Sequence, residues 1–163
     1  MAIRRFIPYP DKRLRTVCTP VETITDQITE IWQDMLDSMY AMPGVGLGAN
    51  QIGENLQLAV VDCSDTHDQP IRMANPKILH ASAKLRAHEE GSPNLAGVWV
   101  KIERPRAVTV EYMNEAGDIV ERAKKHADEQ DQARSDTLDF YVDPEDAKTW
   151  VEANESAWLG QFT

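Results

Sequence analysis

The sequence predicts an α+β fold in a single domain, with one amphipathic helix near the N-terminus packed on short, mostly antiparallel strands. The length of 163 residues corresponds to one domain of ordinary size. One segment with helical periodicity comes early, and several short strand-like segments follow it. Strands and helices do not alternate regularly, as they do in a parallel doubly wound sheet, so an antiparallel or mixed sheet is expected.

The expected helix covers residues 25–42. Thr23, with Asp26 three residues later, predicts a capping pair at its start. Pro43 and Gly44 predict its end. Because the apolar residues recur at intervals of three and four, one face is expected to pack in the core. These apolar residues are Ile28, Ile31, Trp32, Met35, Leu36, Met39 and Tyr40.

Several short segments follow the helix. The glycine-rich residues 44–53 are expected to form a loop. Residues 56–62 are rich in leucine and valine and predict a strand. Residues 71–76 predict a second strand that ends at Pro76, which cannot donate to a sheet ladder. Residues 78–88 alternate irregularly and predict a longer, half-exposed strand.

The last predicted strands form a hairpin. Residues 107–113 alternate cleanly and place Val108, Val110 and Tyr112 on one face. The turn-forming residues 114–117 come next, so a partner strand is expected to begin directly after them.

The composition changes in the last third of the chain. Residues 121–136 carry almost no apolar side chain beyond alanine, so a solvated or partly disordered helix is expected there. Asp143 and Pro144 then predict the start of a last helix over residues 145–162. Its apolar residues either cover the core or form a surface for a protein partner or a second copy of the chain. These residues are Trp150, Trp158, Leu159 and Phe162.

The net charge of −10 argues against two classes of partner, nucleic acids and anionic membranes, since both are bound mainly by clustered cations. No apolar run of about 18 residues is present to span a bilayer. The N-terminus lacks the apolar stretch and cleavage site of a signal peptide, so a cytoplasmic protein is expected. Cys18 and Cys63 are predicted to be buried free thiols, and neither has a metal-ligand spacing.

The glycine-rich segment GVGLGANQIG is the first candidate for a functional site. It lacks the Gly-Lys-Ser/Thr ending of a phosphate loop, and it follows a helix rather than a strand, unlike a dinucleotide fingerprint. Its remaining physical use is a backbone that passes close to another group. The side-chain amide of Gln51 can donate and accept hydrogen bonds there, either in a pocket or within the loop itself.

Several motifs, in order along the chain, resemble those of the peptide deformylase family. The loop that ends at Gln51 resembles the family motif GxGLAAxQ, and residues 90–94, EGSPN, stand where the family has EGCLS. The resemblance covers residues 3 to 120 and is specific, because separate motifs occur in the family's order. The supporting motifs are Tyr9-Pro10-Asp11 with Leu14-Arg15, then Asn75-Pro76, Arg104-Pro105, and the turn after the VxVxY strand.

The family resemblance implies a cytosolic metallohydrolase that removes the formyl group from the N-terminal methionine of nascent chains. The family holds iron or zinc through the cysteine of EGCLS and two histidines of an HExxH helix, whose glutamate is the general acid and base. Such a metal can lower the pKa of bound water from roughly 15.7 to about 7. The resemblance implies that Gln51 and the backbone N–H after the cysteine stabilise the oxyanion. It places the substrate pocket at Gly44, Val45, Gly46, Leu47, Glu90 and Gly91.

The sequence departs from the family at every metal ligand. Ser92 replaces the cysteine, and a serine hydroxyl is a poor ligand for a transition metal. No HExxH occurs in the chain, and the best local match puts Asp128 and Gln132 at the two histidine positions. That match keeps Glu129 as the general base, although a neighbouring register fits as well, and Glu129 also suits a solvated helix of mixed charge. Pro93 removes the backbone N–H that follows the ligand position.

We therefore expect a deformylase-like protein without ordinary deformylase activity and with no bound metal cofactor. Its scaffold would bind a nascent or short peptide, or another protein. The alternative is an active, metal-dependent deformylase with a rearranged carboxylate-rich site, whose oxygen ligands favour Mg, Ca or Mn. That site would draw on Glu89, Glu90, Asp128, Glu129 and Asp131. A third hypothesis is a binding module with no peptide pocket, in which the groove beside residues 46–51 is filled.

Overall fold

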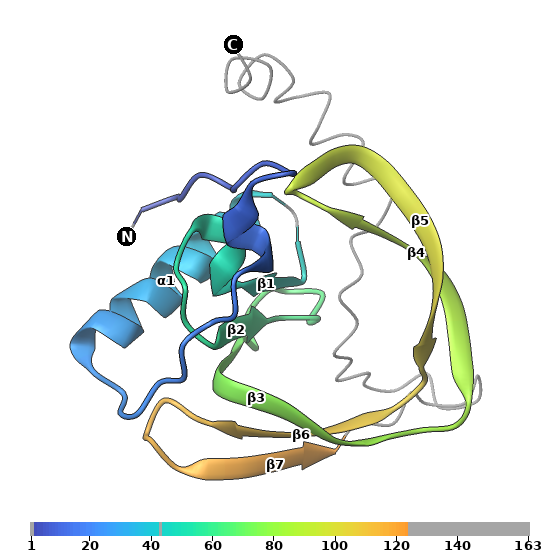
Figure 1. The fold of residues 1–163 in the computed structure, drawn as a ribbon. Coiled ribbons are helices and arrows are strands. Elements are labelled where there is room, and N and C mark those ends of the chain that lie inside the picture. Colours follow the sequence, from blue (N-terminus) through green and yellow to red (C-terminus); the bar gives the residue numbers. More distant parts are fainter. Residues whose placement is uncertain (1, 43, 124–163) are drawn as a thin grey trace.

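The computed structural model describes residues 2–42 and 44–123, and it confirms the predicted α+β class (Figure 1). One long helix and seven strands make up the described part, together with two short 3-10 helices, η1 and η2. The expected helices over residues 121–136 and 145–162 lie largely or wholly outside the described residues. In chain order the elements are η1 (Lys12–Arg15), α1 (Asp26–Ala41), β1 (Gly46–Gly48), η2 (Ala49–Ile52), β2 (Leu58–Val61), β3 (Ile71–Ala81), β4 (Leu85–Ser92), β5 (Leu95–Pro105), β6 (Val108–Met113) and β7 (Ile119–Ala123).

Helix α1 confirms the predicted helix, but its start differs from the expected capping pair. Thr25, in an extended conformation, is the N-cap, and its hydroxyl accepts a hydrogen bond from the backbone N–H of Ile28 at 3.4 Å. Asp26 is the first helical residue, where a carboxylate interacts favourably with the helix dipole. The N-cap is therefore Thr25 and not Thr23, so the helix begins two residues later than the expected capping pair requires. The apolar face is buried as predicted, and Trp32, Met35 and Met39 are completely inaccessible.

Five strands form an antiparallel sheet in the order β1-β2-β3-β6-β7. Helix α1 packs against the β1–β2 end of this sheet, where its apolar face meets Leu47, Leu58 and Val60. Because neighbouring residues of a strand point to opposite faces, Val61 belongs to a second cluster with Met73, Val110 and Tyr112. The expected face of β6 is confirmed, and β7 confirms the predicted hairpin.

Strand β3 passes through Pro76 instead of ending there. The register with β6 shifts between Ala74 and Lys77, so the ladder does not need a donor from Pro76. Asn75 adopts a left-handed conformation, with φ of 53°, and its side chain explains why. Its Oδ1 accepts from the backbone N–H of Val21 at 2.8 Å, and its Nδ2 donates to the carbonyl of Val21 at 2.7 Å. The bulge is thus fixed by a contact to a segment 54 positions away.

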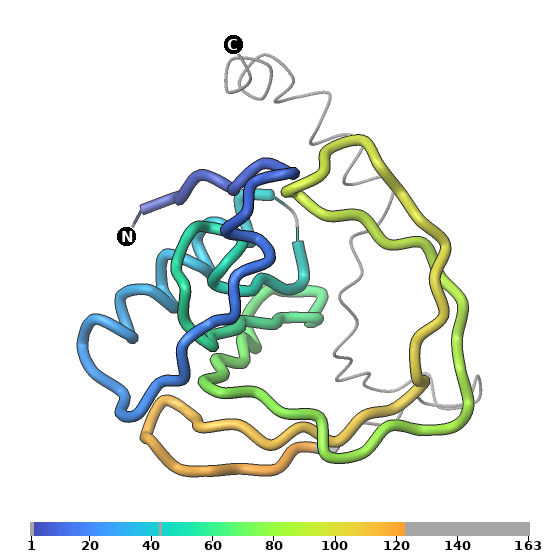
Figure 2. The backbone as a smooth tube through the Cα atoms, in the orientation of Figure 1, coloured from blue at the N-terminus to red at the C-terminus, as the bar shows by residue number. Residues whose placement is uncertain are grey.

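Strands β4 and β5 form a separate two-stranded sheet. The single strand expected over residues 78–88 is in fact two, because β3 ends at Ala81 and β4 begins at Leu85. Strand β5 was not predicted, because most of its residues are exposed and give no clean alternation. Figure 2 shows that β3 leads into β4 and β5 leads into β6, so the hairpin curves away from the main sheet and its tip lies beside the N-terminal segment.

Three smaller expectations are also corrected. The glycine-rich segment is not all loop, because residues 46–48 pair with β2 and residues 49–52 form η2. Glu121 and Arg122 belong to β7, not to a polar helix. Cys18 and Cys63 are thiols, but both are half-buried rather than buried. Among the described residues, no helix is long and apolar enough to cross a membrane.

A buried carboxylate ties α1 to the loop after β2. Asp62, only 1% exposed, accepts hydrogen bonds from the Tyr40 hydroxyl at 2.6 Å and the Ser64 hydroxyl at 2.6 Å. It also accepts from the backbone N–H groups of Ser64 and Gln69. Burial raises the pKa of Asp62, but the hydrogen bonds from Ser64 and Tyr40 outweigh burial and hold the pKa below its usual value.

Replacing Tyr40 with Phe tests this contact. The carboxylate of Asp62 loses a donor while it remains buried, so Tyr40→Phe should lower the free energy of unfolding by about 1–2 kcal/mol in urea denaturation. Tyr9→Phe is the control, because Tyr9 is 51% exposed and its substitution should change little. Equal effects of the two substitutions would contradict a specific role for the bond to Asp62.

Candidate functional site

The side-chain amide of Gln51, the predicted oxyanion donor, lies at the end of β1. Helix η2 places it there, with Gly48 as its N-cap and Gly53, which has a left-handed φ of 92°, as its C-cap. Gln51 Oε1 accepts from the backbone N–H of Gly48 at 2.8 Å. Its Nε2 donates to Oδ1 of Asn94 at 2.6 Å. Both ends of the amide are therefore held, and one N–H of Nε2 remains for another acceptor.

Asn94 joins three segments that are far apart in the sequence. It is 6% exposed and lies in the turn between β4 and β5. Its Nδ2 donates to the carbonyl oxygens of Ile7 at 2.7 Å and Gln51 at 2.9 Å. The backbone carbonyl of Asn94 accepts a hydrogen bond from the backbone N–H of Tyr9 at 2.7 Å. The amide therefore fixes the N-terminal segment, the glycine-rich segment and the hairpin tip against one another.

Ser92, which the sequence resemblance places at the family's cysteine position, is bonded to Asn94. Its hydroxyl donates to Asn94 Oδ1 at 3.2 Å and accepts from the backbone N–H of Asn94 at 3.3 Å. The following residue, Pro93, has no N–H to offer an oxyanion. The turn is thus closed by neutral hydrogen bonds at the place where the resemblance implies a thiolate.

Among the described residues, one edge of β1 pairs with no other strand. Within the described residues, β1 pairs with β2 alone, and the carbonyl of Val45 accepts from Asp62 N at 2.9 Å. Because antiparallel strands alternate their bonding direction, the N–H and C=O of Gly46 then point away from β2. The resemblance placed Leu47 at the substrate pocket, but its side chain is fully buried in the core. Gly44 is also buried.

Glu90 and His88 share one face of the β4–β5 hairpin, here called the inner face, and Glu90 belongs to a network that the sequence did not predict. Arg104 donates to both carboxylate oxygens, Nε to Oε1 at 3.0 Å and Nη2 to Oε2 at 2.9 Å. His88 Nε2 lies 2.8 Å from Oε1. The Arg104 hydrogen bonds, aided by His88 and opposed by burial, hold the pKa of Glu90 below its usual value. Sequence reasoning missed His88, since only its spacing of two residues from Glu90 on one strand indicates the pair.

Glu89 and Gly91 take different roles from those expected. Consecutive strand residues face opposite sides, so Glu89 is exposed on the outer face and does not converge with Glu90. The expected carboxylate-rich site therefore does not form from these two residues. Gly91 makes room for the Trp99 ring, because a Cβ there would lie 3.0–3.1 Å from three ring atoms. This glycine serves packing of the outer face.

The described residues do not fit the iron or zinc of the family. Among them, no group of three or more His, Cys, Asp or Glu side chains could hold a metal ion. Ser92 is engaged with Asn94, and Glu90 is engaged with Arg104. Iron and zinc sites in proteins use thiolate, imidazole or carboxylate ligands, and the neutral hydroxyl of Ser92 belongs to none of these classes. The remaining candidates lie outside the described residues: Asp128, Glu129, Asp131 and Gln132.

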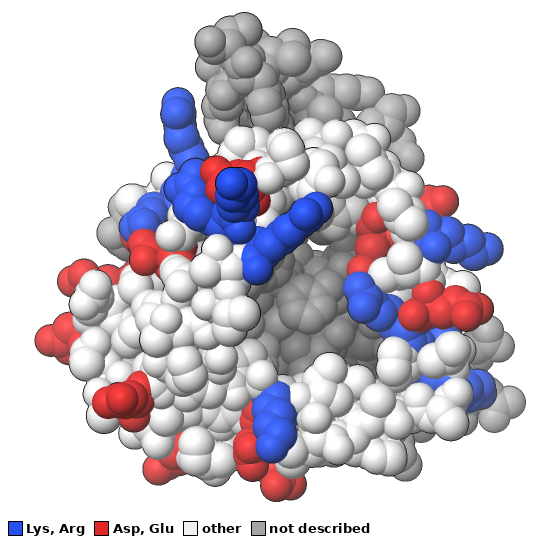
Figure 3. All heavy atoms as spheres, in the orientation of Figure 1, with Lys and Arg blue, Asp and Glu red and all other residues white. Residues whose placement is uncertain are grey.

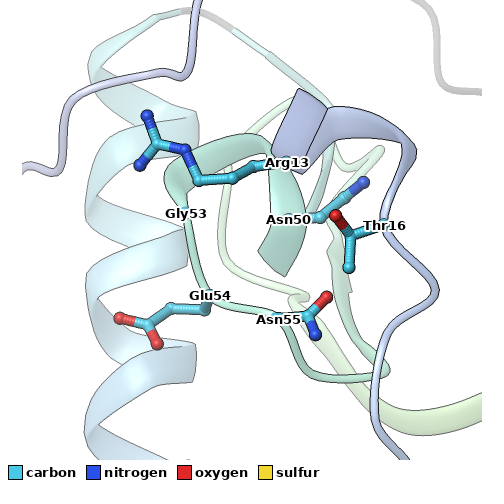
Figure 4. Close-up of a pocket in the computed structure, with 6 residues that line it drawn as sticks. All are labelled: Arg13, Thr16, Asn50, Gly53, Glu54 and Asn55. Carbon is cyan, nitrogen blue, oxygen red and sulfur yellow. The ribbon is translucent and has the colours of Figure 1, made fainter. Parts of the chain in front are cut away.

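A separate pocket of about 250 Å³ lies between η1 and the loop after η2 (Figure 4). Its two charged residues are already paired, Arg13 with Asp11 at 2.7 Å and Glu54 with Arg4. Gln51 is not among its lining residues, so the pocket is distinct from the candidate site. The lining consists of Arg13, Thr16, Asn50, Gly53, Glu54 and Asn55.

Comparisons with known proteins agree on one family. Residues 3–132 match the family model described as polypeptide deformylase. The chain is 38% identical over 121 residues to the peptide deformylase of Acinetobacter baumannii (strain SDF), covering 74% of this chain and 69% of that protein. It is 41% identical over 119 residues to the peptide deformylase of Rhizobium meliloti (strain 1021), covering 72% and 68%.

Solved structures show the same similarity. The peptide deformylase from Legionella pneumophila has a TM-score of 0.74 at 26% identity and covers 98% of both chains. The enzyme from Thermotoga maritima has a TM-score of 0.72 at 28% identity, covering 77% of this chain and 84% of that one. The chain thus shares the overall fold of these proteins.

Asn94→Ala tests the junction at the hairpin tip. The substitution removes the Asn94 bonds to the carbonyl of Ile7 and to Nε2 of Gln51 and one of the two bonds to the carbonyl of Gln51, so the free energy of unfolding should fall by about 2–3 kcal/mol. Urea denaturation measures this change. Asn55→Ala is the matched control, because Asn55 is exposed and its removal should have little effect. A near-zero effect of Asn94→Ala would show that the three segments hold together without it.

The Glu90–Arg104 pair predicts a dependence of stability on pH. A carboxyl whose pKa is lowered by folding stabilises the native state above its ordinary pKa, and this contribution disappears as the pH falls through the folded pKa. Glu90→Gln should therefore flatten the loss of stability between neutral pH and about pH 3, measured by urea midpoints. Glu89→Gln, on the exposed face, should leave the profile unchanged. The network would be unsupported if both variants behaved alike.

Proposed function

The chain belongs to the polypeptide deformylase family, and on this premise we propose that it binds the N-terminal end of a peptide along the free edge of β1. The relatives act on peptides, as their name states. The observation that carries the proposal is the position of Gly46: its N–H and C=O point away from β2 at the edge of the sheet, and Gly48, two residues later on β1, holds the amide of Gln51. A cytoplasmic location and a protein partner or second copy remain predictions from the sequence.

The peptide would add to β1 as a strand. Gly46 has no side chain, so a second backbone can approach its N–H and C=O closely. A carbonyl at the start of the peptide would then lie next to Gln51, whose Nε2 has one N–H that Asn94 does not use. Because Asn94 and Gly48 hold the amide at both ends, Gln51 donates from a fixed position without rearrangement.

Removal of the formyl group is the reaction that homology to named peptide deformylases supports. We propose that this chain lacks the ordinary form of that activity. Ser92 and Pro93 take away a metal ligand and an oxyanion donor, and His88 and Glu90 are committed to a network with Arg104. The alternative, hydrolysis at a rearranged carboxylate-rich site, is favoured by the family match, which extends through residue 132 and includes Glu129.

A hydrolysis assay distinguishes these two functions. Formyl-Met-Ala-Ser is incubated with the purified full chain and with iron, nickel, zinc, manganese or magnesium in turn, and formate release is measured. We expect no release above that of the Glu129→Gln variant, which controls for contaminating host enzyme. Release that depends on metal and is lost in the variant would establish the alternative and refute the proposed loss of activity.

Peptide binding is tested by changing the ligand, so that the protein fold is untouched. Strand pairing uses alternate peptide N–H groups, so N-methylation of one of two adjacent residues should block the bond to Gly46. That peptide should bind about tenfold more weakly in calorimetry, whereas methylation of the neighbouring residue should matter little. Equal effects at both positions would exclude an added strand on β1, and absence of binding by the unmodified peptide would exclude the function itself.

A further inference from the structure

The N-terminal segment carries a cationic surface that the proposed function does not use. Residues 4–15 hold five Lys and Arg residues and one acidic residue, a net charge of +4 in a chain whose net charge is −10. Figure 3 shows Lys and Arg side chains gathered over the N-terminal segment and η1. The charge of the molecule is therefore unevenly distributed, and an anionic partner that the chain as a whole repels meets an attractive surface here.

Three of these five cations have no acidic partner in the part of the chain that the structure describes. The other two are already neutralised, Arg4 by Asp34 and Glu54, and Arg13 by Asp11. A cation that is not neutralised within the protein stays available to an anion from solution. The three available cations, all of them exposed, are Arg5, Lys12 and Arg15.

The short helix η1 sets the spacing of two of these cations. In a 3-10 helix, side chains three residues apart eclipse each other and the rise is about 2.0 Å per residue, so Lys12 and Arg15 project from the same side about 6 Å apart along the axis. Successive phosphates of an extended single strand are spaced similarly. The two side chains therefore suit a row of phosphates better than one isolated anion.

An exposed aromatic ring lies beside these cations. Tyr9 is 51% exposed, and the guanidinium carbon of Arg15 lies 5.7 Å from the centroid of its ring. Nη2 of Arg15 also donates to the Tyr9 hydroxyl at 3.4 Å. Surfaces that bind single-stranded nucleic acids combine cations for the phosphates with aromatic rings on which the bases stack. An acidic protein segment would use the cations but has no need of the ring.

We propose that this N-terminal surface binds a single-stranded nucleic acid, with phosphates at the three available cations and a base stacked on Tyr9. The negative charge of the rest of the chain would confine the strand to this surface. Because the backbone N–H of Tyr9 donates to the carbonyl of Asn94, a bound strand would lie beside the hairpin tip. The inference goes beyond the proposed function and does not depend on peptide binding.

Fluorescence anisotropy of a labelled twelve-residue oligouridine, titrated with the full chain, tests this proposal. Each phosphate contact on a single strand adds about 0.7 to the steepness with which log affinity falls against log salt, so three contacts predict a slope of about −2 and about a 20-fold loss of affinity between 50 and 200 mM salt. Replacing all three available cations with glutamine should remove most of this salt dependence. These variants alter only exposed side chains and should fold.

A matched control removes the same charge from other elements. Lys77→Gln, Lys84→Gln and Lys101→Gln together replace three exposed lysines on β3, on β5 and in the turn between β3 and β4, and they should leave affinity and slope nearly unchanged. Equal losses in the two triple variants would show that only net charge matters and would overturn the proposed surface. A parallel titration with oligodeoxythymidine distinguishes RNA from DNA, since the tighter of the two identifies the ligand.

Substitutions of Tyr9 separate a nucleic acid from other polyanions. Tyr9→Leu should weaken oligouridine binding about tenfold with the salt slope unchanged, whereas Tyr9→Phe keeps the ring and should bind normally. Unchanged affinity of Tyr9→Leu, with polyglutamate competing as well as oligouridine, would identify a surface for acidic proteins and contradict the proposal. Absence of oligouridine binding at 50 mM salt would also overturn it. None of these results bears on the proposed peptide binding, which is measured without nucleic acid.

Discussion

The side-chain amide of Asn94 is the contact on which the geometry of the candidate site depends. The β4–β5 hairpin is a two-stranded sheet, and such a hairpin has little stability by itself. Asn94 anchors its tip to Ile7 and Gln51, and the same amide holds the donor group of Gln51. Because these polar groups are buried, each must keep its partner, so the three segments are fixed together.

This junction also shows how the turn at position 92 is held together by hydrogen bonds alone. A thiolate at position 92 would carry a charge that a metal neutralises, whereas the Ser92 hydroxyl is neutral and is satisfied by Asn94. The Ser92 hydroxyl therefore has both a hydrogen-bond donor and an acceptor within the turn. Farther along the hairpin, Arg104 and Glu90 fix His88. Both groups of contacts fix the shape of the hairpin, and the proposed peptide site depends on that shape.

Sequence patterns predicted the elements whose signals are local. Helix α1 has a regular apolar stripe, and β6 and β7 have clean alternation around a turn. Strand β5 has no such signal, because both faces of the hairpin are largely exposed. The passage of β3 through Pro76 depends on Asn75 and its distant partner Val21, which no local pattern contains. The sequence motif pointed to Gln51. It did not reveal the role of Asn94, because the partners of Asn94 lie 43 and 87 positions away in the sequence.

Metal content of the full chain most directly tests whether this member of the family has given up its metal centre. The chain is purified without chelators, supplied with iron(II) or zinc, passed through gel filtration and analysed by mass spectrometry of its metals. The replaced ligands predict iron and zinc contents well below one ion per chain. Retention of one ion per chain, lost in a Ser92→Ala or Glu129→Gln variant, would contradict the account. It would favour the alternative, an active metal-dependent deformylase.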